Sequence, residues 1–176
     1  MNEIYARIFA RNYRLPIVGL RYFNAFGRRQ SPEGAYAAVI PRWFANLMAS
    51  QPCQIFGDGE TSRDFTHVSN VVQANLLAAR AAKNTSGREF NVACGGRLSL
   101  NELHAAMADS VRRYLPHLSF VPPRYEPFRA GDIRHSLADI ARTRSVLGYE
   151  PETSLSDGLD ETLEWHIERQ RSLAVA

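Results

Sequence analysis

IVGLRYF, at residues 17–23, is a short apolar run bounded by Pro16 and the polar Asn24. A run of this kind is typical of a strand that is buried on both faces of a parallel sheet. EFNVAC, at residues 89–94, is a second candidate strand. Segments with apolar residues at helical spacing lie before, between and after these two runs, and the alternation predicts an α/β fold.

Six segments have this helical spacing. They are residues 3–13, 37–50, 70–82, Ser99 to Tyr114, 138–147 and 156–171. Pro41 falls in the first turn of the second helix, where proline is tolerated. Ser99 and Glu102 form a capping box at the start of the fourth helix. Gly148 is expected to end the fifth helix in a left-handed conformation.

Three further features connect these elements. Asp58-Gly59 lies between candidate strands at 53–56 and 64–68, and it predicts a tight hairpin turn. A short strand is expected at 118–121, before two prolines, and residues 129–136 form a polar loop.

Composition excludes several classes of protein. The 176 residues are 45% hydrophobic and 22% charged, which is normal for a globular domain. The 21 basic residues are spread among 18 acidic ones, and no apolar run approaches the ~18 residues that span a bilayer. We therefore expect neither nucleic acid nor a membrane as a partner. The N-terminus lacks the features of a secretion signal, so a cytoplasmic location is expected.

Metal and cofactor motifs are missing from the sequence. Cys53 and Cys94 lie far apart and form no CxxC, and the histidines lack the HExxH spacing of zinc enzymes. His67 is expected to be a core or interface residue. The sequence has no GxGxxG and no GxxxxGK[ST]. We predict no metal site, no cofactor-binding residue and no catalytic pair in this chain.

Polar residues at the ends of predicted elements mark the candidate site. Asn24 follows a buried strand, where ligands of open α/β sheets bind, but it could equally be a turn residue that bonds its own backbone. Arg63 and Arg129 suit a diphosphate, because a guanidinium offers a planar fork of donors. Asp132 could accept a bond from a ribose hydroxyl or cap a turn.

The alternative for both arginines is an ion pair within the chain. Arg63 could pair with Asp64 or Glu60, and Arg129 could pair with Asp132. The residues alone leave both interpretations open.

Three stretches of the chain resemble a known protein family. They are LRYFNAFGRRQSPEGAYAAVIPRWFANLM (20–48), IFGDGETSRDFTHVSNVV (55–72) and FRAGDIRHSLADIARTRSVLGYEP (128–151). In order and spacing they resemble the C-terminal half of extended short-chain dehydrogenase/reductase (SDR) nucleotide-sugar epimerases and dehydratases. Within that family they look most like bacterial UDP-N-acetylglucosamine 4-epimerases. The resemblance implies a single truncated unit, 1–176, in which the last elements of an NAD(P)-binding Rossmann-like fold are interleaved with the substrate-binding subdomain, and the N-terminal Rossmann half is missing.

The same resemblance assigns roles to residues of the substrate half. Asn24 matches an asparagine that bonds the UDP-sugar diphosphate, and Ala38-Val39 match the segment that covers the uracil and the sugar. Arg63 matches the arginine of an R-D-[FY] motif that neutralises the diphosphate. Arg129 and Asp132 match an R-x-G-D motif, with the arginine on phosphate and the aspartate on ribose.

Ser136 falls where glucose- and galactose-restricted epimerases carry a bulky tyrosine. A small side chain there would leave room for an N-acetyl group, although a serine flanking a helix is the alternative reading. The chain departs from the family at Ser69-Asn70, where relatives often have acidic residues. We interpret this change as structural, with Ser69 capping the next helix.

The resemblance also implies what the chain lacks. Family members hold NAD with a glycine-rich turn and use a Tyr-x-x-x-Lys pair, and here neither Tyr5 nor Tyr13 has a lysine four residues later. We expect a truncated or naturally shortened form of a full enzyme, catalytically inactive and without bound NAD, that binds UDP-sugar weakly at best. The exposed half-sheet and first helix should leave apolar surface uncovered, so we expect a homo-oligomer.

The intact enzyme would oxidise the sugar C4 hydroxyl by hydride transfer to NAD and return the hydride to the other face of the 4-keto sugar. The expected function is thus that of UDP-GlcNAc/UDP-GalNAc 4-epimerases, which supply sugars for surface polysaccharides. The alternatives are a dehydratase or decarboxylase of the same superfamily, or a non-catalytic binding or oligomerisation module that pairs with a separate Rossmann chain.

Overall fold

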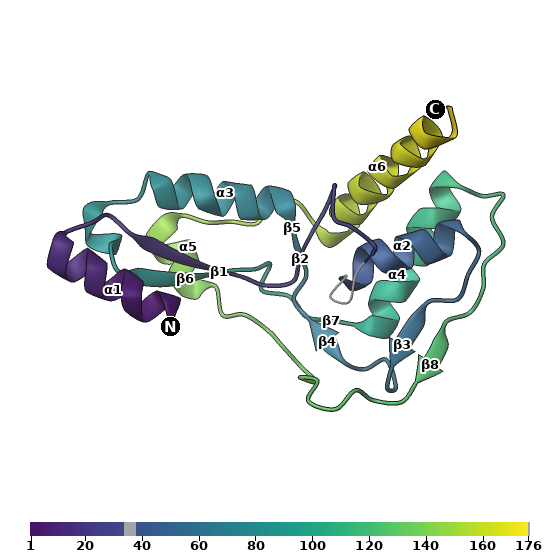
Figure 1. Cartoon of the computed structure of the whole chain (residues 1–176), viewed down its shortest axis with the longest axis horizontal. Coiled ribbons are helices and arrows are strands. Elements are labelled where there is room, and N and C mark those ends of the chain that lie inside the picture. Colours follow the sequence, from purple (N-terminus) through teal and green to yellow (C-terminus); the bar gives the residue numbers. More distant parts are fainter. Residues whose placement is uncertain (34–37, 176) are drawn as a thin grey trace. The chain divides into compact units, whose positions relative to one another are not determined.

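The computed structural model describes residues 1–33 and 38–175, with side chains described up to residue 172 (Figure 1). The chain forms two compact units, each made of three segments. Unit 1 consists of Met1–Ala25, Asp64–Gly96 and Leu137–Thr153, and unit 2 consists of Phe26–Arg63, Arg97–Ser136 and Ser154–Ala176. Among the helices described, none combines the length and apolar content needed to cross a membrane.

The sheet of unit 1 contains the two strands expected from the sequence. β1 (Val18–Tyr22) and β6 (Arg88–Val92) pair in parallel, with Leu20 opposite Phe90. The prediction that the first strand is buried on both faces is wrong. Side chains alternate along a strand, so one face carries apolar residues and the other carries Arg21 and Glu89. The apolar face contributes to a core that includes Ala74, Val92 and Tyr149.

Three helices accompany this sheet: α1 (Asn2–Tyr13), α3 (Val68–Ala79) and α5 (Ala141–Leu147). Unit 1 also contains the short strand β5 (Thr66–His67) and the 3₁₀ turn η1 (Lys83–Thr85), while β2 (Ala25–Phe26) straddles the division. The predicted helices are confirmed, with boundaries shifted by up to three residues. Gly148 ends α5 at φ 67°, as expected, and His67 is buried.

Ser69 does not cap α3, so that prediction is wrong. The helix begins one residue earlier, and its N-cap position is His67, without a side-chain cap. Ser69 Oγ instead lies 2.8 Å from His67 Nδ1 and 2.6 Å from Thr153 Oγ1. The next residue, Asn70, is buried and accepts hydrogen bonds from the backbone N–H groups of Glu152 and Thr153. Both polar residues therefore fasten α3 to the segment after α5, which is the structural role we expected of the pair.

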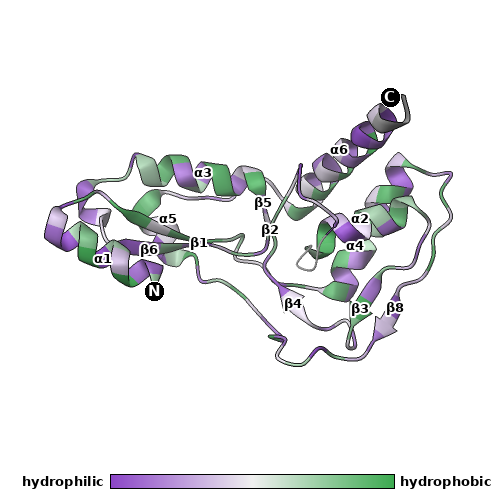
Figure 2. Cartoon of the chain, in the orientation of Figure 1, coloured by the Kyte–Doolittle hydropathy of each residue, from purple (hydrophilic) through white to green (hydrophobic). Residues whose placement is uncertain are grey.

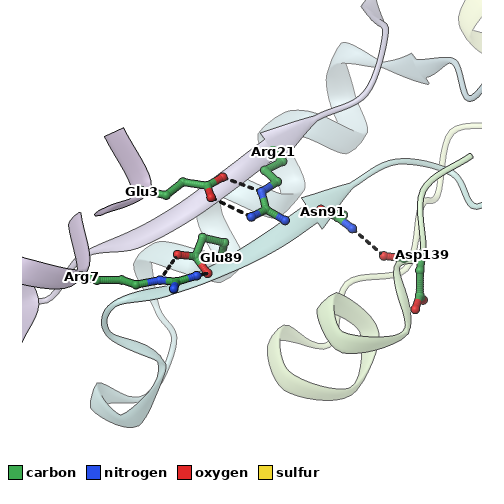
Figure 3. Close-up of polar contacts among 6 residues, drawn as sticks. All are labelled: Glu3, Arg7, Arg21, Glu89, Asn91 and Asp139. Atoms are coloured by element: carbon green, nitrogen blue, oxygen red, sulfur yellow. Dashed lines mark hydrogen bonds and ion pairs between the residues drawn. The ribbon is translucent and has the colours of Figure 1, made fainter. Parts of the chain in front are cut away.

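α1 meets the sheet with its charged side chains (Figure 3). Arg7 forms a bidentate pair with Glu89, and Glu3 forms a bidentate pair with Arg21. None of the residues of α1 is buried. Five of its large apolar and aromatic side chains are 44–66% exposed: Ile4, Tyr5, Ile8, Phe9 and Tyr13. Figure 2 shows hydrophobic (green) and hydrophilic (purple) stretches alternating along α1.

Unit 2 is built around three helices: α2 (Val39–Met48), α4 (Leu100–Tyr114) and α6 (Leu155–Val175). All three were predicted, and Pro41 lies in the first turn of α2. The capping box of α4 is confirmed, since the Glu102 N–H donates to Ser99 Oγ and the Ser99 N–H donates to the Glu102 carboxylate. Leu103, Met107 and Val111 of α4 are buried in the core of the unit.

The hairpin predicted at Asp58-Gly59 is wrong. A turn is present, but β3 (Gln54–Phe56) pairs in parallel with β8 (Arg124–Glu126), and β4 (Ser62–Arg63) pairs antiparallel with β7 (Leu98–Ser99). The turn is fixed by the start of α4, because the Asn101 side chain donates to the Asp58 carbonyl and the Asn101 N–H donates to the Gly59 carbonyl. The turn signal was correct, but it did not identify the strand partners.

The strand predicted at 118–121 is also wrong. Phe120 packs by its side chain, with its ring 5.8 Å from the His104 ring and the Arg112 guanidinium 4.4 Å above it. β8 begins only after the two prolines, which have no N–H to donate to a sheet. The Arg124 N–H, the first one after them, donates to the Cys53 carbonyl and starts the pairing with β3.

Candidate functional site

The loop at 129–136, predicted to be polar, runs beside β4 in unit 2. The Ser62 N–H donates to the Arg134 carbonyl at 2.9 Å, and the Ser136 N–H donates to the Ser62 carbonyl at 3.0 Å. These bonds make a parallel bridge between Ser62 and His135. The Ser62 hydroxyl also lies 2.8 Å from His135 Nδ1. The end of the loop therefore has a fixed register against the strand that carries Arg63.

Arg63 is held by this loop. Its Nη2 donates to Asp132 Oδ1 at 2.9 Å, and its Nη1 donates to the carbonyls of Ser62 and Arg134 at 2.9 and 3.2 Å. The side chain is only 18% exposed. The structure thus brings together two of the predicted site residues, Arg63 and Asp132. The alternative pairing of Arg63 with Asp64 or Glu60 is wrong, because the carboxylate partner is Asp132.

Asp64, the neighbour of Arg63, is fully buried and has different partners in unit 1. Its two carboxylate oxygens accept hydrogen bonds from the backbone N–H groups of Cys94 and Gly95, at 3.0 and 2.9 Å. Burial raises the pKa of Asp64, and these backbone bonds oppose the shift. The aspartate therefore fastens the end of β6.

Arg129 and Arg134 lie over aromatic rings. The Arg129 guanidinium carbon is 3.6 Å from the centre of the Phe56 ring, and that of Arg134 is 3.9 Å from the centre of the Phe128 ring. The predicted alternative of an Arg129–Asp132 ion pair is wrong, because the Asp132 carboxylate pairs with Arg63.

Phe128 packs directly on Gly57. A Cβ atom built at Gly57 would lie 1.9 Å from the Phe128 ring, so only glycine leaves space for it. Sequence reasoning missed Phe56 and Phe128. The available signal was their position, since Phe56 directly precedes Gly57 and Phe128 directly precedes Arg129.

Asn24 lies in unit 1, two residues after the end of β1, in a left-handed conformation with φ 34°. Its side-chain Nδ2 donates to the Asp64 carbonyl at 2.9 Å, and its own carbonyl accepts from the Thr66 N–H at 3.3 Å. The interpretation that Asn24 bonds its own local backbone is wrong, because its partner is forty residues away in sequence.

The remaining predicted site residues belong to unit 2. Ala38 is the extended N-cap residue of α2, with φ −65° and ψ 157°, and Val39 begins the helix. Ser136 is part-exposed and is held by its backbone bond to Ser62. Residue 37, where the second predicted helix was expected to begin, lies outside the described residues.

Two local features bear on metal and dinucleotide binding: the grouping of metal-ligating side chains among the described residues and the glycine turn after β6. Among them, no three His, Cys, Asp or Glu side chains gather in a way that could hold an ion. A dinucleotide pyrophosphate requires free backbone N–H groups at a glycine-rich turn after a strand. Gly95 follows β6, but its N–H and that of Cys94 already donate to Asp64, whose charge would repel a phosphate. This turn does not fit NAD.

Comparisons with known proteins relate the chain to sugar-nucleotide enzymes. Residues 1–93 match the model of the NAD dependent epimerase/dehydratase family. A UDP-glucose 4-epimerase of Mycolicibacterium smegmatis is 36% identical over 163 residues, which are 93% of this chain and 49% of that protein. The chain therefore spans about half the length of such relatives.

Two solved structures are similar in fold. A UDP-N-acetylglucosamine 4-epimerase from Methanobrevibacter ruminantium, in complex with UDP-N-acetylmuramic acid, matches with a TM-score of 0.86 and 36% identity, over 95% of this chain and 51% of that one. A UDP-glucose 4-epimerase from Thermotoga maritima, with UDP-glucose, matches with a TM-score of 0.85 and 35% identity, over 96% and 51%.

Proposed function

The chain belongs to the NAD dependent epimerase/dehydratase family, and from this premise we propose that it is the substrate-binding half of a nucleotide-sugar 4-epimerase. The proposed substrates are UDP-N-acetylglucosamine and UDP-N-acetylgalactosamine, used in the synthesis of surface polysaccharides. Similar proteins named as UDP-sugar 4-epimerases support the reaction class.

One observation carries the proposal: the loop at 129–136 is folded onto β4 so that Arg63 and Asp132 meet. In the proposed complex, Arg63 and Arg129 supply positive charge for the diphosphate, and a carboxylate oxygen of Asp132 accepts a bond from a ribose hydroxyl. Ala38 and Val39 are proposed to cover the uracil and the sugar.

A binding experiment tests this assignment. NMR titration of the chain with UDP-N-acetylglucosamine at low salt should show weak saturable binding. Arg129→Gln should weaken it about tenfold, since a charge-assisted hydrogen bond is lost. The control is Arg124→Gln, in the same unit, whose side chain is 72% exposed and should not affect binding. Failure of the unaltered chain to bind any UDP-sugar would overturn the proposed function.

The N-acetyl specificity rests on Ser136. A hydroxymethyl side chain occupies far less volume than a phenol, which supports a sugar with a bulky C2 substituent. Ser136→Tyr should reduce the affinity for UDP-N-acetylglucosamine and leave that for UDP-glucose unchanged. Equal loss for both sugars would argue against this specificity.

We propose further that the chain alone does not turn over its substrate. The sequence contains no Tyr-x-x-x-Lys pair, and its only lysine is Lys83. An assay for interconversion of UDP-N-acetylglucosamine and UDP-N-acetylgalactosamine should therefore give no product. Product formation by the purified chain would contradict this part of the proposal.

A second candidate function within the superfamily is supported by other relatives. A UDP-N-acetyl-alpha-D-glucosaminuronate decarboxylase of Bacillus cytotoxicus is 29% identical, and a dTDP-glucose 4,6-dehydratase of Streptomyces niveus is 30% identical. Tighter binding of a dTDP-sugar than of any UDP-sugar would favour the dehydratase.

A role in self-association is favoured by the exposed apolar residues of α1. Apolar surface of this kind marks protein contact surfaces. We propose that α1 pairs with α1 of a second copy. Analytical ultracentrifugation should then show a concentration-dependent dimer, and a monomer at all concentrations would exclude it.

A further inference from the structure

We propose that two buried histidines of unit 2, His104 and His166, make the packing of α2 sensitive to acid. Uncharged, they pack against Trp43 and Phe44 of α2. Protonated at mildly acidic pH, they loosen α2 from α4 and α6. The histidine pair is thus a pH-sensitive device in the core of the unit, separate from the residues that are proposed to contact the ligand.

The two histidines reach adjacent residues of α2 from two different helices. The ring centre of His104, on α4, lies 5.6 Å from that of Trp43, at an interplanar angle of 81°. The ring centre of His166, on α6, lies 5.9 Å from that of Phe44, at 48°. Trp43 and Phe44 are both buried. Each neighbouring helix therefore contacts α2 through an imidazole ring.

The surroundings of the two rings suit an uncharged imidazole. Phe120 lies 5.8 Å from His104, and Trp165 lies 4.9 Å from His166. Both histidines are buried, and the Nε2 atom of each has no hydrogen-bond partner among the described residues. A neutral imidazole can leave one ring nitrogen without a proton, whereas an imidazolium has a donor at both nitrogens and a charge to compensate.

The charges nearest to the histidines are positive. Arg112 acts on His104, and Arg169, three residues along the helix, acts on His166. Burial, and to a smaller extent these arginines, lower the pKa of both histidines from the ordinary value of 6.5.

The carboxylates of the surrounding elements are engaged elsewhere or directed elsewhere. α2 and β7 contribute none, and the segment at 115–123, which carries Phe120, has His117 as its only titratable side chain. Glu168 is two residues from His166 and so does not share its face of the helix. The other acidic residues of α4 and α6 have partners of their own: Glu102 with Ser99, Asp109 with Arg112, Asp157 with Ser154, Asp160 with Arg113, Glu161 with Arg28, and Glu164 with Tyr114.

α4 and α6 are also joined by a contact that does not involve the histidines. Asp160 of α6 accepts hydrogen bonds from the Ser110 hydroxyl and the Arg113 guanidinium of α4. The buried residues of α2, in contrast, are all apolar or aromatic, and Arg42 is its one charged residue. Protonation of the histidines should therefore loosen α2 while α4 and α6 stay together.

The sign of the effect follows from the direction of the pKa shifts. The folded state holds these histidines with lowered pKa values, so a state with α2 detached binds protons more readily. The stabilisation of α2 is fully present above about pH 6.5 and is lost as the pH falls toward the lowered values. For each histidine, the equilibrium constant that holds α2 in place should fall by up to about tenfold per pH unit in this range.

A consequence for the ligand rests on the proposed function. Ala38 and Val39, which are proposed to cover the uracil and the sugar, lie at the start of α2. When α2 is loosened, these residues are no longer held in place. Acid should therefore weaken the binding of a UDP-sugar.

Amide exchange tests the release of α2 without a ligand. After correction for the intrinsic rate, the N–H groups of α2 in the unaltered chain should be less protected at about pH 5.5 than at about pH 7.5. Those of α4, and of α3 in unit 1, should keep their protection. NMR of the imidazole rings at the same pH values should show His104 and His166 uncharged in the folded chain.

The matched variants keep the rings and remove the titration. The double substitution His104→Phe and His166→Phe retains an aromatic ring at each contact, and the protection of α2 should become the same at both pH values. His117→Phe, at an exposed histidine of the same unit, should retain the pH dependence. If the double variant does not fold, either single substitution should halve the dependence of log protection on pH.

Titration with UDP-N-acetylglucosamine tests the consequence for the ligand. The unaltered chain should bind it more weakly at about pH 5.5 than at about pH 7.5, and the double variant should bind it equally at both. An affinity of the unaltered chain that does not change with pH would contradict this consequence.

Two results would overturn the inference as a whole: equal protection of α2 at the two pH values in the unaltered chain, or a pH dependence that the double variant retains. Both leave the proposed function standing. Failure of the unaltered chain to bind any UDP-sugar at either pH removes that function instead, and the release of α2 is then decided by amide exchange.

Discussion

α1 and α4 have similar sequence patterns, but α4 buries its apolar side chains and α1 exposes them. Both have apolar residues at helical spacing, and both were predicted correctly as helices. α4 turns Leu103 and Met107 into the core of unit 2. α1 turns Glu3 and Arg7 toward the sheet of unit 1 and exposes its apolar side chains. Apolar spacing therefore predicts that a helix forms, but does not predict which face meets the rest of the unit.

The largest expected difference between the two helices is in how much their apolar side chains contribute to stability. Leu103→Ala should lower the free energy of unfolding of unit 2 by about 3 kcal/mol, because it leaves a cavity in a fully buried site. Ile8→Ala on α1, at a side chain that is 44% exposed, should change the stability of the monomer by less than about 0.5 kcal/mol.

Urea unfolding followed by tryptophan fluorescence measures the first of these changes, because both tryptophans, Trp43 and Trp165, lie in unit 2. The unfolding of unit 1 is followed by amide exchange. Equal losses from the two substitutions would show that α1 is also held by apolar burial.

The next effect concerns how the helices begin. Ser99→Ala should cost about 1 kcal/mol in the stability of unit 2, because the capping box loses the acceptor for the Glu102 N–H. α1 has no side-chain cap at its N-cap residue Met1. Asn2→Ala should accordingly leave stability unchanged, and a loss of similar size there would indicate a cap on α1.

A smaller and local effect should appear on acidification. The hydrogen bonds from Arg7 hold the pKa of Glu89 below its ordinary value of 4.5, and Arg21 does the same for Glu3. A carboxylate whose pKa is lowered by folding stabilises the folded state fully above the ordinary value. That stabilisation is lost as the pH falls through the lowered value.

Amide exchange in α1 should therefore accelerate as the pH is lowered below about 4.5, after correction for the intrinsic rate, while α4 keeps its protection. Glu89→Gln is the control. It should loosen α1 already at neutral pH and remove part of the pH dependence. An α1 that stays protected through this range would show that the ion pairs do not hold it.

The smallest effect on monomer stability is expected from a substitution on the exposed face of α1, and it should weaken the proposed dimer. Phe9→Ser removes part of the exposed apolar face of α1, where Phe9 stacks on Tyr13 at 5.2 Å. Monomer stability should stay within about 0.5 kcal/mol. The proposed dimer should dissociate at concentrations where the unaltered chain remains paired, as measured by sedimentation. Unchanged sedimentation would move the contact surface elsewhere.

Much of the fold could be predicted from local signals. The helices, the capping box at Ser99 and the left-handed cap at Gly148 depend on residues close in sequence, and all are confirmed. The failures are choices between distant partners. The turn at Asp58-Gly59 did not reveal that β3 would pair with β8, and apolar residues at 118–121 packed by side chains instead of pairing.

The site shows the same limit. The polar residues Arg63 and Asp132 could be singled out from the sequence, but their bond to each other could not, since it depends on how a loop sixty-nine residues away returns to β4. The aromatic partners of Arg129 and Arg134 were overlooked because a phenylalanine beside a glycine, as at Phe56, or after a proline, as at Phe128, gives no local signal that a guanidinium will stack on it.

The two ion pairs between α1 and the sheet also determine which way the helix runs across the strands. Along the helix the acid comes first and the base second, while their partners are a base on β1 and an acid on β6. If α1 lay over the same strands with its ends exchanged, Glu3 would meet Glu89 and Arg7 would meet Arg21, so like charges would repel. The order of charges thus favours one orientation of α1 on the sheet over the reverse one, whatever later covers the outer side of the helix.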